Sequence, residues 1–278
     1  MANKVNIKNN QKYLSMKKIV ILGAGTGGTI MANKLRKALD REEWKITVVD
    51  QEKTHYYQPG FLFIPFGIYN KADVCKPKND FFPTGIDVIY AKIDKIVPED
   101  NKVLLQEGKV LEYNYLIVST GVRMRPDETP GLKEELWNKQ IFEFYTLEGA
   151  LALANYFRSF EGGKLVMSIA ELPFKCPVAP LEFVFLADEY FSKKGIRDKV
   201  EIFYTTPLSG AFTKPRATAM LSDLLREKNI HVVPDFYLEK VDNLTKKIIA
   251  YDGRELDFDV LTRSEERRVG KECRYRWS

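Results

Sequence analysis

A glycine-rich turn near the start of the chain constrains its fold more than any other feature of the sequence. Residues 18–23, KIVILG, form a short apolar run, residues 29–40 carry apolar residues at helical spacing, and Ile46–Val49 form a second apolar run. This order of strand, turn, helix and strand is typical of a βαβ unit. The turn between the first strand and the helix reads GAGTGG and satisfies the pattern G-x-G-x-x-G, which is typical of dinucleotide-binding turns.

Each glycine of this turn has an expected physical role. Gly23 permits the tight turn, Gly25 lets the backbone approach a pyrophosphate, and Gly28 lets the helix pack closely on the strand. Gly27 belongs to the same turn, and Asp50 closes the next strand, where a carboxylate accepts hydrogen bonds from ribose hydroxyls. Together these residues predict a dinucleotide-binding site.

The rest of the chain continues the alternation of strands and helices. Apolar runs predict strands at Asp87–Tyr90, Lys102–Leu105, Tyr115–Ser119, Lys164–Ile169, Val200–Tyr204 and His231–Val233. Helical spacing predicts helices at Leu147–Arg158, Pro180–Phe191 and Ala217–Lys228. These patterns predict an α/β fold with two Rossmann-like domains in tandem. We place the first part of one domain at residues 16–160 and an incomplete second domain at 161–262, with 1–15 as a disordered or mis-annotated leader.

The positive charge of the chain resides at its two ends. Of the formal net charge of +5, residues 1–15 contribute +3 and residues 263–278 a further +3, which leaves −1 for residues 16–262. This balance gives no reason to expect a nucleic-acid partner. The leader lacks the apolar core of a secretory signal, and no run approaches the roughly 18 apolar residues of a membrane span. We therefore expect a cytoplasmic protein that attaches to a membrane, if at all, at its surface.

A further segment indicates which dinucleotide is bound. Residues 113–131, YNYLIVSTGVRMRPDETPG, resemble the Y-D-x-L-[IV]-[IV]-A-T-G signature of flavoproteins with two dinucleotide-binding domains. In those flavoproteins the strand and its Thr-Gly turn lie against FAD. The resemblance implies FAD as the ligand of the glycine-rich turn, with Thr120 and Gly121 among its contacts.

The second domain lacks the glycine pattern that would bind a nicotinamide dinucleotide. Its matching segment, residues 164–182, reads KLVMSIAELPFKCPVAPLE, in which prolines remove backbone donors and bulky side chains fill the space of a pyrophosphate. Cys176 stands there instead, in a loop before a helix, where the helix dipole and neighbouring Lys175 favour the thiolate. A thiolate is suited to nucleophilic or disulfide-exchange chemistry, although an isolated cysteine is more often a small buried apolar residue.

Three stretches together resemble the family of sulfide:quinone oxidoreductase and the flavoprotein subunit of flavocytochrome c sulfide dehydrogenase. They are GAGTGG with Asp50, HYYQPGFLFIPFG at residues 55–67, and KCPVAPLE at residues 175–182. The resemblance implies that Gln58 lies in the flavin's surroundings, that Cys176 is a redox cysteine, and that Glu182 is its acidic partner and a proton carrier. Residues 55–67 equally suit an aromatic core loop, and Glu182 equally suits a solvated carboxylate of a first helical turn.

The resemblance implies an FAD-dependent oxidoreductase of the pyridine nucleotide-disulfide oxidoreductase type. In that family hydrosulfide attacks a bridge between two cysteines, two electrons reach FAD, and a membrane quinone accepts them. Tyr145 and Gly149 stand where many members have a cysteine and a histidine, so we expect FAD to be bound non-covalently. Cys75 matches no motif of the family and is expected to be a surface or structural thiol. The oligomeric state stays open, with a homo-oligomer as one option.

Three other functions stay open at this point. A type II NADH:quinone oxidoreductase shares the fold but needs a second glycine pattern. The flavocytochrome subunit reduces a cytochrome and normally needs export. The third function is that of a non-catalytic FAD-binding fragment, because the family's second redox cysteine comes after residue 262, where this chain has only Cys273.

The final segment, residues 263–278, departs from the rest of the sequence. It reads RSEERRVGKECRYRWS, and its charge density is incompatible with a flavin pocket without a heavy desolvation cost. Its first twelve residues match the translation of a common short-read sequencing adapter. We therefore expect this segment to be an artefactual tail on a truncated gene, which an intact genomic read through codons 255–278 would contradict.

Overall fold

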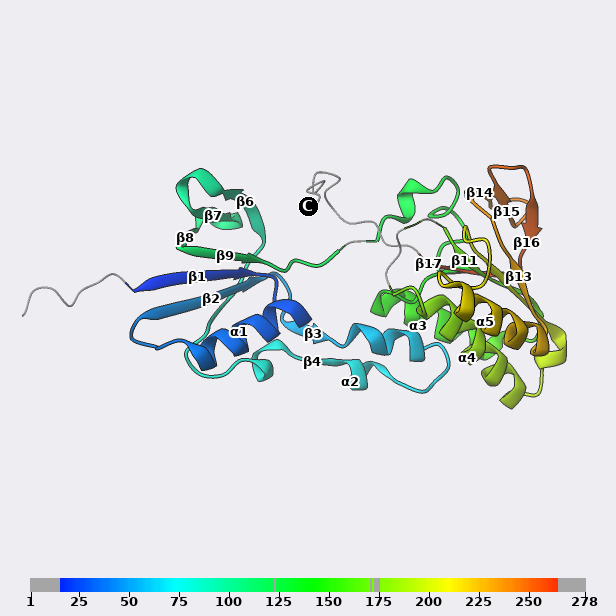
Figure 1. Ribbon diagram of the computed structural model, residues 1–278, viewed down its shortest axis with the longest axis horizontal. Coiled ribbons are helices and arrows are strands. Elements are labelled where there is room, and N and C mark those ends of the chain that lie inside the picture. The colour runs from blue at the N-terminus through cyan, green and yellow to red at the C-terminus, as the bar shows by residue number, and fades with distance from the viewer. Residues whose placement is uncertain (1–15, 123, 171, 173–175, 265–278) are drawn as a thin grey trace, which may run out of the picture. The chain divides into compact units, whose positions relative to one another are not determined.

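The computed structural model describes residues 16–122, 124–170, 172 and 176–264. Its internal contacts divide the chain into two compact units (Figure 1). Unit 1 holds the chain up to Tyr56 together with Cys75–Gly121, and unit 2 holds Tyr57–Val74 together with the chain from Val122 onward. Because the chain leaves unit 1 at Tyr57 and returns at Cys75, unit 2 includes a segment of the N-terminal half.

Unit 1 is built on a parallel sheet of four strands in the order β5-β2-β1-β9. The strands are β1 (Lys17–Leu22), β2 (Trp44–Asp50), β5 (Asp87–Tyr90) and β9 (Tyr115–Val118). Helix α1 (Thr26–Ala38) lies on one side of this sheet, and Figure 1 shows an antiparallel β-meander on the other. The meander consists of β6 (Ile93–Val97), β7 (Lys102–Leu105) and β8 (Val110–Glu112). The predicted strand, turn, helix and strand are therefore confirmed.

The continuous apolar run of β1 follows from burial on both faces of the sheet. Ile19 and Ile21 pack in the core cluster on the α1 side, whereas Val20 and Leu22 pack with Val103 of the meander. Successive side chains of a strand point to opposite faces, so a strand covered on both sides needs apolar residues at every position.

A short hairpin connects the sheet of unit 1 to the segment that belongs to unit 2. Strand β3 (Thr54–Tyr56) pairs antiparallel with β4 (Cys75–Pro77), and a 3-10 turn, η3 (Lys78–Phe81), follows. The chain between the two strands contains η2 (Gln58–Phe63) and α2 (Lys71–Val74).

Unit 2 is built on a parallel sheet of five strands in the order β10-β17-β11-β12-β13. The strands are β10 (Ile141–Phe142), β11 (Gly163–Ile169), β12 (Val200–Thr205), β13 (Ile230–Val233) and β17 (Val260–Ser264). The helices are α3 (Leu147–Ser159), α4 (Ala179–Lys193) and α5 (Pro215–Glu227). A second antiparallel meander consists of β14 (Leu238–Asp242), β15 (Lys247–Ala250) and β16 (Glu255–Asp257).

Short 3-10 turns complete the described elements of both units. They are η4 (Pro98–Asp100) and η5 (Gln106–Gly108) in unit 1, and η6 (Pro126–Glu128) and η7 (Arg197–Lys199) in unit 2.

The predicted α/β fold with two parallel sheets is confirmed, whereas the domain boundaries at residues 160 and 262 stay predictions. Strand β17 includes Arg263 and Ser264, the first two residues of the segment expected to be an artefactual tail. Both are fully buried, and they pair with Ser168 and Ile169 of β11. The structure therefore places the first two residues of this segment inside the sheet of unit 2, whereas residues 265–278 lie outside the described residues.

An aromatic cluster holds the segment of residues 57–74 in unit 2. Phe66 is 7% exposed, and its ring centroid lies 5.9 Å from that of Phe157, 5.3 Å from Phe183 and 5.9 Å from Tyr190. Aromatic pairs at such distances add to the hydrophobic stabilisation of the buried area. The aromatic segment at 55–67 therefore supplies a core residue, as its alternative interpretation expected.

A buried ion network joins α4 to the end of α5. The Asp188 carboxylate accepts a hydrogen bond from Arg197 Nε at 2.7 Å and one from Lys228 Nζ at 2.7 Å. Burial opposes ionisation of Asp188, but the hydrogen bonds from Lys228 and Arg197 outweigh it and lower the carboxyl pKa. Asp188 therefore stays ionised and fixes the relative positions of the two helices.

Candidate dinucleotide and redox sites

The turn between β1 and α1 is shaped by close backbone contacts at two glycines. Gly23 has a φ of +92°, and a Cβ there would lie 2.3 Å from the Ser119 carbonyl oxygen. A Cβ on Gly28 would lie 1.8 Å from the Gly23 carbonyl oxygen. Both positions therefore exclude every side chain, which explains the first and third glycines of the pattern.

The middle of the turn is open. Gly25 is the N-cap of α1 and has no side chain that could cap the helix. A Cβ added at Gly25 would meet nothing within 4 Å. At Gly27 the nearest atom to an added Cβ is 3.6 Å away. The first turn of α1 contains no acidic residue. Gly25, Thr26 and Gly27 are exposed, so the start of α1 is accessible to a ligand, as a diphosphate site requires.

The Asp50 carboxylate lies at the carboxyl end of β2, directly beside this turn. Its Oδ2 accepts a hydrogen bond from the Ala24 N–H at 2.7 Å and pairs with Lys78 Nζ at 2.9 Å. Its Oδ1 accepts one from the Glu52 N–H at 2.8 Å. Asp50 thus ties β2 to the glycine-rich turn, and Oδ1 keeps a further lone pair for another donor.

The end of β9 is fixed against the same turn by Ser119. The Ser119 hydroxyl lies 2.9 Å from the Leu22 carbonyl oxygen and 3.0 Å from the Gly23 carbonyl oxygen. The backbone N–H of Ser119 also donates a hydrogen bond to the Leu22 carbonyl oxygen. Thr120 and Gly121 follow at once, with Gly121 at a φ of +74°. The predicted contacts Thr120 and Gly121 therefore lie at the same edge of the sheet as the glycine-rich turn.

A cavity of about 310 Å³ opens at this edge, at the carboxyl ends of the strands of unit 1. Its lining comprises Gly23, Val49, Asp50, Gln51, Ala91, Lys92, Ile93, Gln106 and Thr120. Gly23, Asp50 and Thr120 were predicted from the sequence as cofactor contacts, whereas the other lining residues were not. Ala91 and Lys92 directly follow β5, so the rule that ligands bind at the carboxyl ends of parallel strands could have found them.

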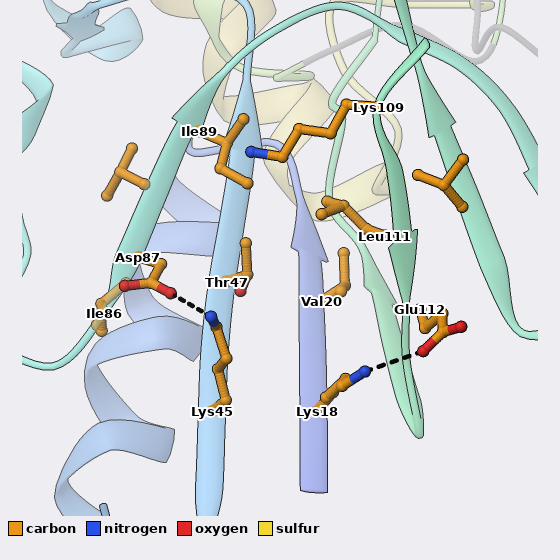
Figure 2. Close-up of a pocket in the computed structure, with 12 residues that line it drawn as sticks. Lys18, Val20, Lys45, Thr47, Ile86, Asp87, Ile89, Lys109, Leu111 and Glu112 are labelled. Carbon is orange, nitrogen blue, oxygen red and sulfur yellow. Dashed lines mark hydrogen bonds and ion pairs between the residues drawn. The ribbon is translucent and has the colours of Figure 1, made fainter. Parts of the chain in front are cut away.

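A larger hollow of about 660 Å³ lies at the opposite, amino-terminal ends of the strands (Figure 2). Val20, Thr47 and Ile89 form part of its lining. An ion pair between Lys45 and Asp87 at 3.0 Å stands on one side, and one between Lys18 and Glu112 at 2.9 Å on the other. Dinucleotides bind beyond the carboxyl ends of parallel strands. The smaller cavity is therefore the candidate cofactor site.

The His55 imidazole lies near the candidate cofactor site. Burial lowers the pKa of His55, and the positive charge of Lys78 lowers it further. A hydrogen bond with the backbone of Ala24 and the negative charge of Asp50 act in the opposite direction, but the net shift is downward. Its ring packs on Phe81 at a centroid distance of 4.3 Å. His55 thus lies within strand β3, where it pairs with Lys76 of β4, and not in a loop.

The candidate redox residues lie in unit 2. Cys176 is an exposed free cysteine with a φ of +53°, and its carbonyl accepts a hydrogen bond from the Ala179 N–H at 3.0 Å. It thus forms the turn that precedes α4. Glu182 is exposed in the first turn of α4, and Gln58 is exposed at the start of η2. Lys175 and Cys273 lie outside the described residues.

The predicted residues are thus divided between the two units. Unit 1 holds the residues predicted to contact the cofactor's diphosphate, ribose and flavin: Gly23, Gly25, Gly27, Gly28, Asp50, Thr120 and Gly121. Gln58, Cys176 and Glu182 belong to unit 2. Among the residues that the structure describes, no helix is both long enough and apolar enough to cross a bilayer.

Comparisons with known proteins identify related chains. The family model described as pyridine nucleotide-disulphide oxidoreductase matches residues 17–161. A mitochondrial sulfide:quinone oxidoreductase from Dictyostelium discoideum is 30% identical over 225 residues, which are 81% of this chain and 50% of the relative. A type II NADH:quinone oxidoreductase from Staphylococcus aureus is 28% identical over only 119 residues, 42% of this chain and 29% of the relative.

Among solved structures, the sulfide:quinone oxidoreductase from Aquifex aeolicus resembles the chain with a TM-score of 0.76 at 22% identity. The match covers 90% of this chain and 59% of that structure. It supports the fold of tandem dinucleotide-binding domains. This chain spans about half the length of the curated sulfide:quinone oxidoreductases that it matches.

Proposed function

Because the chain belongs to the pyridine nucleotide-disulphide oxidoreductase family, we propose that the intact protein oxidises sulfide to sulfane sulfur or polysulfide with FAD and passes the electrons to a membrane quinone. The sulfide:quinone oxidoreductase relative matches along both units, whereas the type II NADH:quinone oxidoreductase relative matches less than half of the chain. The activity is proposed for the intact protein, since the chain spans about half of these relatives.

The position of Cys176 carries the proposal. An exposed thiol stands directly before α4, next to β11 in the sequence, where a Rossmann-like domain otherwise has its glycine-rich turn. Pro177 and Pro180 flank this turn and cannot donate backbone hydrogen bonds to a pyrophosphate. This replacement favours sulfur chemistry in unit 2 over the binding of NADH.

The residues of unit 1 fit a dinucleotide. The open turn at Gly25 and the first turn of α1 would receive the diphosphate, Asp50 would accept a ribose hydroxyl, and Thr120 would line the cofactor. When bound, FAD supplies an acceptor for two electrons. We propose that it is held non-covalently, with Gln58 in the flavin's surroundings.

The residues of unit 2 would handle sulfur and protons. Cys176 would supply one sulfur of a disulfide bridge to a second cysteine, and hydrosulfide would attack this bridge. That attack breaks the bridging S–S bond, forms a new S–S bond to the incoming sulfur, and releases the other sulfur as a thiolate. Glu182, in the first turn of α4, would accept the proton of hydrosulfide.

The proposed acceptor also sets where the protein works. A membrane quinone requires peripheral contact with a bilayer, which we propose on its cytoplasmic side. A homo-oligomeric state stays an option.

Donor selectivity tests the proposal. The intact protein, expressed from the complete gene and loaded with FAD, is assayed for quinone reduction with sulfide or NADH as the electron donor. We expect turnover with sulfide and none above background with NADH. Turnover with NADH alone would assign the protein to the type II NADH:quinone oxidoreductases instead.

A further inference from the structure

A buried lysine lies next to the candidate cofactor site. Lys78 is 4% exposed, and its Nζ lies 2.9 Å from Asp50 Oδ2, whose side chain is 15% exposed. No sequence motif pointed to this residue. A lysine is rarely buried unless it is paired, so the ion pair is a defined feature of unit 1.

The β3–β4 hairpin brings Lys78 to this position. Thr54 pairs with Pro77 at the open end of the hairpin, and the Lys78 N–H donates to the Lys53 carbonyl at 2.8 Å. Lys53 comes three residues after Asp50 in the sequence, so these contacts hold Lys78 beside the carboxyl end of β2. The same Asp50 oxygen accepts the Ala24 N–H at 2.7 Å, which places the ammonium group at the glycine-rich turn.

The negative charge of Asp50 disfavours an anionic ligand nearby, and Lys78 can offset this charge. Asp50 lines the cavity at the carboxyl ends of the strands, together with Gly23 of the turn that would receive a diphosphate. A bare carboxylate at this point would repel the negative charges of the diphosphate, and partial burial would strengthen the repulsion. The Lys78 ammonium offsets the carboxylate charge while leaving a lone pair on Oδ1 for a ribose hydroxyl.

We propose that Lys78 is a charge-compensating residue of the dinucleotide site, which acts through Asp50 and makes this edge of unit 1 tolerant of an anionic ligand. The proposal rests on the proposed binding of FAD by unit 1. The alternative is that Lys78 only cross-links the hairpin to the sheet. The two roles differ in how the loss of Lys78 depends on the charge of the ligand.

A series of adenine ligands of increasing charge separates these roles. Binding of adenosine, AMP and ADP to the 278-residue chain is measured by calorimetry for the wild type, Lys78→Gln and Lys78→Arg. Lys78→Gln keeps a donor for Asp50 but removes the charge, and we expect ADP to bind on the order of tenfold more weakly. AMP should lose less and adenosine less than about twofold, while Lys78→Arg should restore most of the ADP affinity. The matched control Lys76→Gln, an exposed lysine of β4, should leave all three affinities unchanged.

Two results would overturn the proposal. An equal loss for all three ligands would show that Lys78 acts only as a structural cross-link, and unchanged ADP binding would show that it has no role in the site. If Lys78→Gln does not fold, Lys78→Met removes the same charge and supports the same comparison. A wild-type chain that binds neither FAD nor ADP would instead contradict the proposed function, which keeps the two failures distinct.

Discussion

Substitution of two glycines in the same turn separates the stability of unit 1 from its binding of a dinucleotide. In Gly28→Ala, the new Cβ would lie 1.8 Å from the Gly23 carbonyl oxygen, whereas real Cβ contacts are essentially never under 3.0 Å. Helix α1 would therefore have to retreat from β1 by more than an ångström. Overpacking of this kind costs about 3 kcal/mol, which lowers the melting temperature by more than about 5 °C.

Gly25→Ala should behave differently, although it changes the same turn. Its Cβ would meet nothing within 4 Å, and the backbone φ of −74° is ordinary for alanine. The free energy of unfolding should therefore change by less than about 1 kcal/mol. The new methyl group would occupy the space that the diphosphate needs, so FAD should bind at least about tenfold more weakly.

Thermal unfolding and equilibrium titration with FAD measure both quantities on each variant. The expected pattern is a large stability loss for Gly28→Ala and a selective affinity loss for Gly25→Ala. Unchanged FAD affinity in a well-folded Gly25→Ala variant would refute the assignment of the diphosphate to this turn. An equally stable Gly28→Ala variant would refute the close packing of α1 on β1.

Three further outcomes follow from unit 2. Asp188→Asn should lower the free energy of unfolding by about 2 kcal/mol, while the exposed-pair control Asp223→Asn should change it by less than about 0.5 kcal/mol in chemical denaturation. The pKa of Asp188 in the folded protein is lowered from its ordinary value of 3.8, so the stabilisation that Asp188 gives the fold is present above that pH and is lost as the pH falls below it. Asp188→Asn should therefore remove the contribution of Asp188 to the loss of stability in acid. Phe66→Ala should cost about 3 kcal/mol and make residues 57–74 cleavable in limited proteolysis, whereas the control Ile68→Ala, at an exposed position, should do neither.

The local pattern of the sequence determines much of unit 1. The glycine spacing predicts the turn because Gly23 and Gly28 make contacts that no side chain allows, and these contacts are local to one βαβ unit. The continuous apolar run of β1 indicates that the strand is buried on both faces of the sheet, whichever residues pack against it. The fold class and the glycine-rich turn could therefore be predicted from the sequence.

Features that depend on contacts between distant segments could not be predicted in this way. Lys78 lies beside Asp50 because β3 pairs with β4, which are separated by residues 57–74. No short sequence pattern indicates that these two strands pair. Phe66 packs in unit 2 although it precedes two strands of the parallel sheet of unit 1, β5 and β9, so its partners could not be predicted from its neighbours in the sequence. Helix and strand boundaries were close, as for the helix expected at Pro180–Phe191, which runs as Ala179–Lys193.

The role of Cys176 is the central claim, and sulfide-dependent quinone reduction by the intact protein tests it most directly. Cys176→Ser is compared with the matched control Cys75→Ser, which removes a thiol from β4 of unit 1. Both variants are first shown to bind FAD as the wild type does. We predict that Cys176→Ser loses at least about a thousandfold in turnover, because serine cannot form the bridge that hydrosulfide attacks, and that Cys75→Ser keeps wild-type turnover. Wild-type turnover by an FAD-loaded Cys176→Ser variant would contradict the account.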